Sequence, residues 1–82
     1  MGNKKREINE KFGTELKIAR MRLNLPVTRL AELLDITPQQ VYNLEKSDKI
    51  HNVIKYLFTL RANNADLNSL FDNVFEKRKY TV

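Results

Sequence analysis

The sequence predicts an all-α protein in which five short helices pack as an orthogonal bundle. Apolar residues recur at spacings of three and four, which places them on one face of a helix. Cap and turn residues separate these stretches, and no stretch alternates polar and apolar residues as a half-buried β-strand does. With 82 residues, the chain has room for one domain with a single core.

Residues 1–11 are mostly charged and are interpreted as a solvated N-terminal arm, helical at most near its end. The first helix is expected from residue 12, where four apolar residues begin to share one face: Phe12, Leu16, Ala19 and Leu23. Asn24 can end this helix in the left-handed conformation, and Pro26 suits the start of the next one.

The second helix is expected over residues 26–34 and the third over residues 38–46. Thr37 is a good N-cap, Pro38 suits a first helical position, and Gln40 can complete a capping box with Thr37.

The fourth helix is predicted from a stripe of apolar residues at positions 0, 3, 4, 7 and 8: Ile50, Val53, Ile54, Leu57 and Phe58. Asn63 and Asn64 would end it, and Asp66 would cap a fifth helix. That helix carries Leu67, Leu70, Phe71, Val74 and Phe75. The folded domain is therefore placed at residues 12–75, with a basic C-terminal tail at 76–82.

Composition excludes several classes of protein. The chain has no cysteine and one histidine, and it has no Gly-rich phosphate loop, so we expect no enzyme, metal site or cofactor. No stretch is apolar enough to span a membrane, and the basic N-terminus lacks the apolar core of a secretion signal, so a cytoplasmic protein is expected. Fifteen Lys and Arg against ten Asp and Glu give a net charge of +5, which favours a polyanionic partner.

Residues 27–46 have the order of side chains that a helix-turn-helix needs. Ala31 is small enough to let the two helices approach closely, and Asp35 stands where the chain must turn. Leu30, Val41 and Leu44 would close the angle between the helices from beneath. This pattern predicts a DNA-binding helix-turn-helix.

In such a motif the start of the second helix faces the major groove. Gln39, Gln40 and Asn43 lie opposite Val41 and Leu44 in helical phase, and amides match N6 and N7 of adenine. Tyr42 lies on an exposed face and is added to this set as a base contact. Candidate contacts to the DNA backbone are Thr28, Arg29, Lys46, Lys49 and Lys55. The alternative is that each of these is an ordinary solvated side chain.

Arg20 near the end of the first helix and Glu45 near the end of the third are predicted to form a partly buried ion pair. The alternative is two unrelated surface charges.

Residues 12–71 resemble the lambda-repressor-like, XRE-type helix-turn-helix family of bacterial and phage regulators. The residues that carry the resemblance are Gly13, Leu16, Arg20, Leu30, Ala31, Val41, Leu44 and Glu45. The resemblance implies that Gln39, Gln40 and Asn43 read bases, that Arg20 and Glu45 form a structural ion pair, and that members bind as dimers. The chain departs from the family at three positions. Pro26 stands where the family has a Ser or Thr cap, and Val27 stands where it has a Gln that contacts phosphate. Asp35 stands where the family has the turn glycine.

These observations predict a sequence-specific transcriptional regulator that binds double-stranded DNA as a homodimer, with no small-molecule ligand evident. Phe71, Val74 and Phe75 are the predicted dimer contacts, unless they pack within the monomer. The alternative function is a protein-interaction module, such as an antitoxin-like or anti-repressor subunit.

Overall fold

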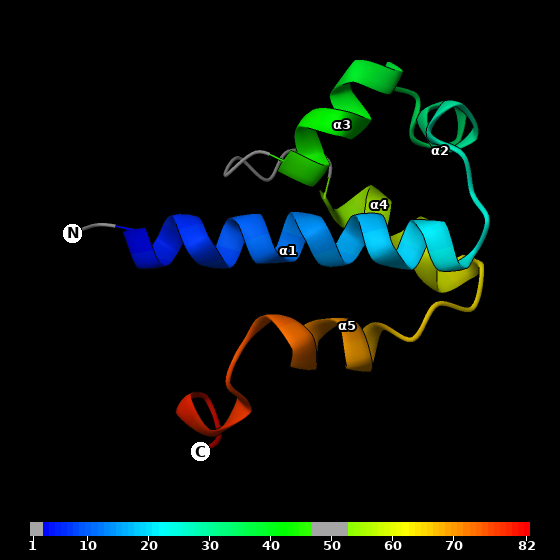
Figure 1. The fold of residues 1–82 in the computed structure, drawn as a ribbon. Coiled ribbons are helices and arrows are strands. Elements are labelled where there is room, and N and C mark those ends of the chain that lie inside the picture. The colour runs from blue at the N-terminus through cyan, green and yellow to red at the C-terminus, as the bar shows by residue number, and fades with distance from the viewer. Residues whose placement is uncertain (1–2, 47–52) are drawn as a thin grey trace.

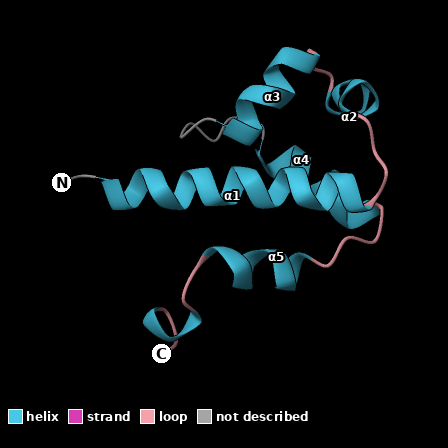
Figure 2. Cartoon of the chain, viewed as in Figure 1, coloured by secondary structure: helices cyan, strands magenta, loops and turns pink. Residues whose placement is uncertain are grey.

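A computed structural model describes residues 3–46 and 53–82, and this part of the chain is helical, without strands (Figures 1 and 2). The elements are α1 Asn3–Arg22, α2 Val27–Leu34, α3 Pro38–Lys46, α4 Val53–Ala62, α5 Leu67–Val74 and the short 3-10 helix η1 Lys77–Lys79. The all-α class predicted from the sequence is therefore confirmed. Within the described residues, none of the helices is both long enough and apolar enough to cross a membrane.

Helix α1 is the axis of a small helical bundle. It packs against α3 and against α5, which lie on opposite sides of it in Figure 1. Helix α2 packs against α3 and α4, and α4 also meets α5. Figure 1 views α2 nearly along its axis while α3 runs across the view, so these two consecutive helices cross steeply.

The expected start of the first helix at Phe12 is wrong, because α1 begins at Asn3. The prediction took a charged stretch for an unstructured arm. The sequence between these positions has no proline or glycine, and Lys, Arg and Glu are good helix formers. A helix anchored by buried residues farther along can therefore extend back through it.

The predicted turn residues have the expected backbone conformation. Asn24, Asp35 and Asn64 have positive φ values of 55°, 59° and 67°, which are left-handed. Asn and Asp tolerate this region better than other non-glycine residues, so Asp35 ends α2 without a glycine. Its N–H donates to the carbonyl oxygens of Ala31 and Glu32, which closes the last turn.

The core lies where α1, α2, α3 and α4 meet, and Leu70 and Val74 extend it to α5. Its most completely buried side chains are Leu16, Leu30, Leu34, Val41, Tyr56 and Leu60. Ala31 is also buried, as the close packing of α2 and α3 requires.

The predicted buried stripe of the fourth helix is partly wrong. Ile54 and Phe58 are 58% and 68% exposed, whereas Tyr56 and Leu60 are buried. Two apolar stripes wind along this helix, and spacing alone does not say which of them faces the core. Packing of Tyr56 against α1 and α3 decides it, and Ile50 lies outside the described residues.

Gly13 permits the close contact between α1 and the end of α3. A Cβ atom at this position would lie 2.5 Å from the carbonyl oxygen of Glu45 and 3.2 Å from that of Leu44. These are backbone atoms, which cannot move aside as a flexible side chain can. The requirement at Gly13 is therefore space, because its φ is not positive.

Candidate nucleic-acid interface

Helix α3 presents a polar outer face and an apolar inner face. Val41, Leu44 and Glu45 are buried, which confirms the predicted phase of this helix. Its exposed residues are Gln39, Gln40, Tyr42, Asn43 and Lys46, so every described candidate on α3 faces solvent. The boundaries Pro38–Lys46 are those predicted from the sequence.

A reciprocal capping box fixes the start of α3. The backbone N–H of Gln40 donates to Oγ1 of Thr37 at 3.1 Å, and the backbone N–H of Thr37 donates to Oε1 of Gln40 at 2.9 Å. The predicted cap is thus confirmed. In the free protein the amide oxygen of Gln40 is therefore engaged by the cap.

Gln39 and Asn43 lie one turn apart and are joined by a hydrogen bond. Nε2 of Gln39 donates to Oδ1 of Asn43 at 3.2 Å. This contact leaves Oε1 of Gln39 as an acceptor and Nδ2 of Asn43 as a donor, both on exposed side chains. The pair is therefore held in a geometry that displays hydrogen-bonding groups along the outer face of α3.

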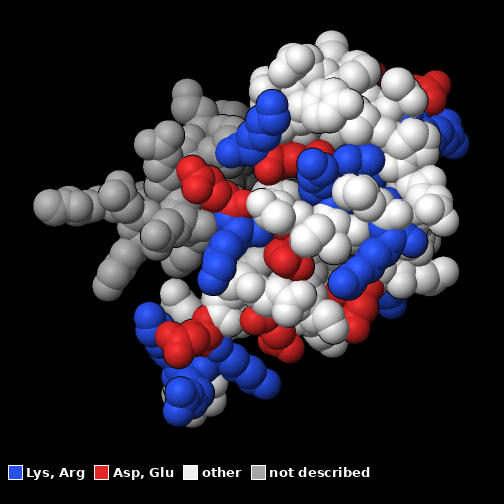
Figure 3. Space-filling view, in the orientation of Figure 1, with Lys and Arg blue, Asp and Glu red and all other residues white. Residues whose placement is uncertain are grey.

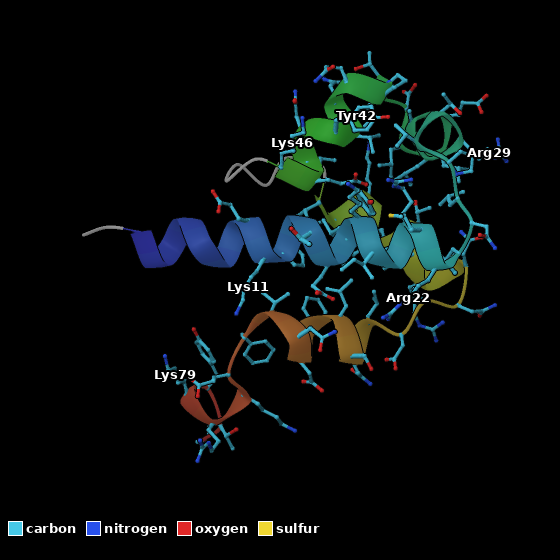
Figure 4. All side chains as sticks on the ribbon, viewed as in Figure 1. Lys11, Arg22, Arg29, Tyr42, Lys46 and Lys79 are labelled. Atoms are coloured by element: carbon cyan, nitrogen blue, oxygen red, sulfur yellow. The ribbon has the colours of Figure 1, made fainter. Side chains whose placement is uncertain are left out.

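The candidate backbone-contacting residues lie around α3. Thr28 and Arg29 are exposed in the first turn of α2, and Nη1 of Arg29 lies 3.7 Å from Oε1 of Glu32. Figure 4 shows Tyr42 between Lys46 and Arg29 in that view. Lys55 is exposed in the first turn of α4, whereas Lys49 lies outside the described residues.

A buried hydrogen-bonded network supports α3 from behind. Nε of Arg20 donates to Oε2 of Glu45 at 2.8 Å, and Nη2 lies 3.4 Å from Oε1. The predicted pair is confirmed, and both residues are buried. Nη1 of Arg20 also donates to the carbonyl oxygen of Leu25 at 3.0 Å, which ties the α1–α2 connection to the same network.

Tyr56 is the third member of this network and was not predicted from the sequence. Its hydroxyl donates to Oε2 of Glu45 and lies 3.3 Å from the carbonyl oxygen of Leu16. Three helices, α1, α3 and α4, therefore converge on one carboxylate. The sequence signal that could have found Tyr56 is its position on the stripe of Val53, Leu57 and Leu60, since a buried tyrosine needs a partner for its hydroxyl.

The network holds Tyr56 protonated and Arg20 charged. Burial raises the pKa of the Tyr56 hydroxyl, and its hydrogen bond to Glu45 and the charge of Glu45 raise it further. Burial alone lowers the pKa of Arg20, but the hydrogen bond to Glu45 and the opposite charge outweigh burial, so that pKa is raised. Both residues thus remain donors to Glu45.

The charges on the face seen in Figure 3 are interspersed rather than gathered into one basic patch. Much of the upper part of that view, where Figure 1 places α2 and α3, is uncharged. Electrostatic attraction to a polyanion would therefore come from scattered Lys and Arg side chains on this face.

The structure changes the set of predicted dimer contacts. Val74 is buried in the monomer core, so it is not available to a partner, and its prediction as a dimer contact is wrong. The phenyl ring of Phe71 stacks on Phe12 with 6.2 Å between ring centroids, yet the residue stays partly exposed. Phe75, the residue after α5, is half-buried, and its ring meets that of Tyr80 in the tail edge-on with 5.5 Å between ring centroids.

No group of three or more His, Asp or Glu side chains in the described residues could hold a metal ion.

A groove of about 230 Å³ lies between α1 and α5, with Glu15, Arg22 and Asp66 among its lining residues. In the described part of the chain, every buried side-chain polar atom has a hydrogen-bond partner.

Comparison of the chain with protein-family models, with curated proteins and with solved structures gives no match.

Proposed function

We propose that this chain is a sequence-specific, DNA-binding transcriptional regulator of the lambda-repressor-like (XRE-type) helix-turn-helix family, bacterial or phage in origin and acting in the cytoplasm. In this proposal α2 and α3 form the helix-turn-helix, and α3 enters the major groove. The observation that carries it is the outer face of α3, whose amide side chains are exposed while its opposite side is held by Glu45.

Base reading is assigned to Gln39, Asn43 and Tyr42. The bonded amide pair offers an acceptor on Gln39 and donors on Asn43, which suits the N6 and N7 groups of adenine. The ring of Tyr42 offers apolar contact to a thymine methyl group. Gln40 is assigned instead to the cap that fixes the start of α3.

Contacts to phosphate are assigned to Thr28, Arg29, Lys46 and Lys55, with Lys49 kept as a prediction from the sequence. No side chain caps α2, where Pro26 precedes the first helical residue. Backbone N–H groups at a helix N-terminus attract anions. The start of α2 can therefore take a phosphate even though Val27 supplies no polar side chain.

The proposed assembly is a homodimer, because one helix-turn-helix makes too few contacts for strong specific binding. Two copies would place their α3 helices about 34 Å apart, one turn of DNA. Phe71 and Phe75 remain the predicted dimer contacts after the exclusion of Val74. Analytical ultracentrifugation of the protein at micromolar concentration, with its selected DNA site present, tests this assembly. A complex that contains only one copy of the chain contradicts it.

The test of DNA reading is selection of bound sequences from random DNA, followed by gel-shift titration of single variants. We expect Gln39→Ala to cost about 1–3 kcal/mol, or about 5- to 150-fold in affinity, and to relax the preference at one base position. Gln40→Ala is the matched neighbour, and it should lower the stability of the fold while leaving the base preference intact. If Gln39→Ala weakens all sequences equally, Gln39 is not a base reader.

A protein-interaction module, such as an antitoxin-like or anti-repressor subunit, is the second candidate. Val27 favours it, since this side chain packs against the core and offers no hydrogen bond to phosphate. Gel shifts on genomic fragments at two salt concentrations separate the two functions. Binding to DNA weakens steeply as salt rises, whereas a module that binds only proteins forms no complex at low salt either.

A further inference from the structure

The outward face of α4 carries two large apolar side chains that the described part of the chain leaves uncovered. Ile54 is 58% exposed and Phe58, one turn later, is 68% exposed. Phe58 is the most exposed phenylalanine among the described residues. Neither contributes to the core, which α4 reaches through Tyr56 and Leu60 on its other side.

All the exposed residues of α4 lie on this one face: Ile54, Lys55, Phe58, Arg61 and Ala62. At about 100° per residue they cover an arc of about 120°, opposite Tyr56. The hydrogen bond of Tyr56 to Glu45 fixes the rotation of the helix, so this face is held outward.

The charge of this face has one sign. Residues 53–62 contain Lys55 and Arg61 but no Asp or Glu. Neither cation has an ion pair within the described part of the structure. An antiparallel pairing of α4 with a second copy would bring Lys55 near Arg61 of that copy, and like charges at such distances repel. The charge therefore favours an acidic partner over a second copy.

We propose that the outward face of α4 docks an acidic, amphipathic helical segment of another protein. Apolar side chains of that segment would cover Ile54 and Phe58, and its carboxylates would pair with Lys55 and Arg61. Two large side chains make a contact well below the roughly 1,200–2,000 Å² of a stable interface, so the complex is transient, with micromolar affinity. The proposal does not depend on DNA binding, but Lys55 is also assigned to phosphate and would serve only one of the two partners at a time.

The test is a phage-displayed library of amphipathic peptides of about 16 residues, selected against the full chain. Apolar positions are kept at helical spacing, and flanking positions vary among Glu, Gln and Lys. We expect Glu to be enriched at the flanking positions. A selected peptide, labelled for fluorescence anisotropy, should bind Phe58→Ala at least about tenfold more weakly. Arg61→Glu should lower the affinity for the selected peptide that carries Glu, and it should raise the affinity for the same peptide with Lys in place of Glu.

Met21→Ala is the control, because Met21 is 57% exposed but lies on α1. Its binding should equal that of the unsubstituted chain, and circular dichroism checks that each variant is folded. Failure to recover any peptide, recovery of Lys-rich or neutral peptides, or equal binding by folded Phe58→Ala overturns the proposal. Sedimentation that shows a dimer lost in Phe58→Ala assigns the face to a second copy and also overturns it.

Discussion

Replacing Arg20 with alanine is expected to lower the free energy of unfolding by about 3–5 kcal/mol, because it leaves the carboxylate of Glu45 buried without its counter-charge. The Glu45 side chain is 2% exposed, so its carboxylate depends on protein donors rather than on solvent. Tyr56 still donates to this carboxylate, which places the expected loss near the lower end of that range. For 82 residues the total stability is about 4–12 kcal/mol, so the loss is a large fraction of it.

Thermal denaturation followed by far-ultraviolet circular dichroism measures this effect. A loss of about 3 kcal/mol lowers the melting temperature of a domain of this size by about 12–24 °C. Sulfate, which strengthens apolar burial, can keep the variant folded at the start of the experiment. Arg22→Ala is the matched control, because Arg22 lies on the same helix but is exposed, and it should change stability by less than about 0.5 kcal/mol.

A double variant separates a stranded charge from a general loss of packing. Arg20→Met combined with Glu45→Leu removes both charges, so it should be more stable than Arg20→Ala alone. The hydroxyl of Tyr56 can then donate to the carbonyl oxygen of Leu16, which lies 3.3 Å away. A melting temperature for Arg20→Ala within about 2 °C of the unsubstituted protein refutes the reasoning, and so does a double variant no more stable than the single one.

Three further changes test other parts of the structure. Tyr56→Phe removes a buried hydrogen bond to a charged group and should cost about 1.5–3 kcal/mol in urea denaturation. The pKa of Tyr56 is raised in the folded state, so the contribution of this residue to the free energy of unfolding is complete below pH 10.0 and is lost as pH rises above that value. Tyr56→Phe should therefore lose less stability in alkali than the unsubstituted protein does. Gly13→Ala should be destabilising by about 1–3 kcal/mol despite the better helix propensity of alanine, since the new Cβ meets the backbone of Glu45, and equal or higher stability would contradict that contact. The hydrogen bonds from Ser69 lower the pKa of Asp66, so its stabilising effect is present above pH 3.8 and is lost as pH falls through the lowered pKa. Asp66→Asn should therefore show a smaller loss of stability between about pH 5 and about pH 2 than the unsubstituted protein does, and identical acid titrations would exclude this role.

Features that depend on neighbouring residues could be predicted from the sequence. The left-handed turns at Asn24, Asp35 and Asn64 follow from the chemistry of Asn and Asp side chains, and the capping box of α3 follows from the spacing of Thr37 and Gln40. These interactions span at most four residues. The sequence alone is sufficient to place them.

Choices between two compatible patterns could not be made from the sequence. Gln40 fits both a cap and a base reader, and only the hydrogen bond to Thr37 shows that its amide oxygen is already used. Val74 and Phe75 are both apolar residues near the end of α5, but only Val74 is buried against the rest of the domain. For Val74 the helix that buries it, α1, is distant in the sequence, whereas for Gln40 the bond to the nearby Thr37 competes with solvent and with other partners of the amide.

By itself, the sequence determined that the chain is helical, where most of its helices begin and end, and that Arg20 and Glu45 would meet. These properties depend on helical periodicity, on caps and on the high cost of burying one charge without another. The tertiary structure alone decided the rotation of α4. It turns Tyr56 toward Glu45 and leaves Phe58 in solvent, because the buried carboxylate gains a donor that no arrangement of local residues supplies.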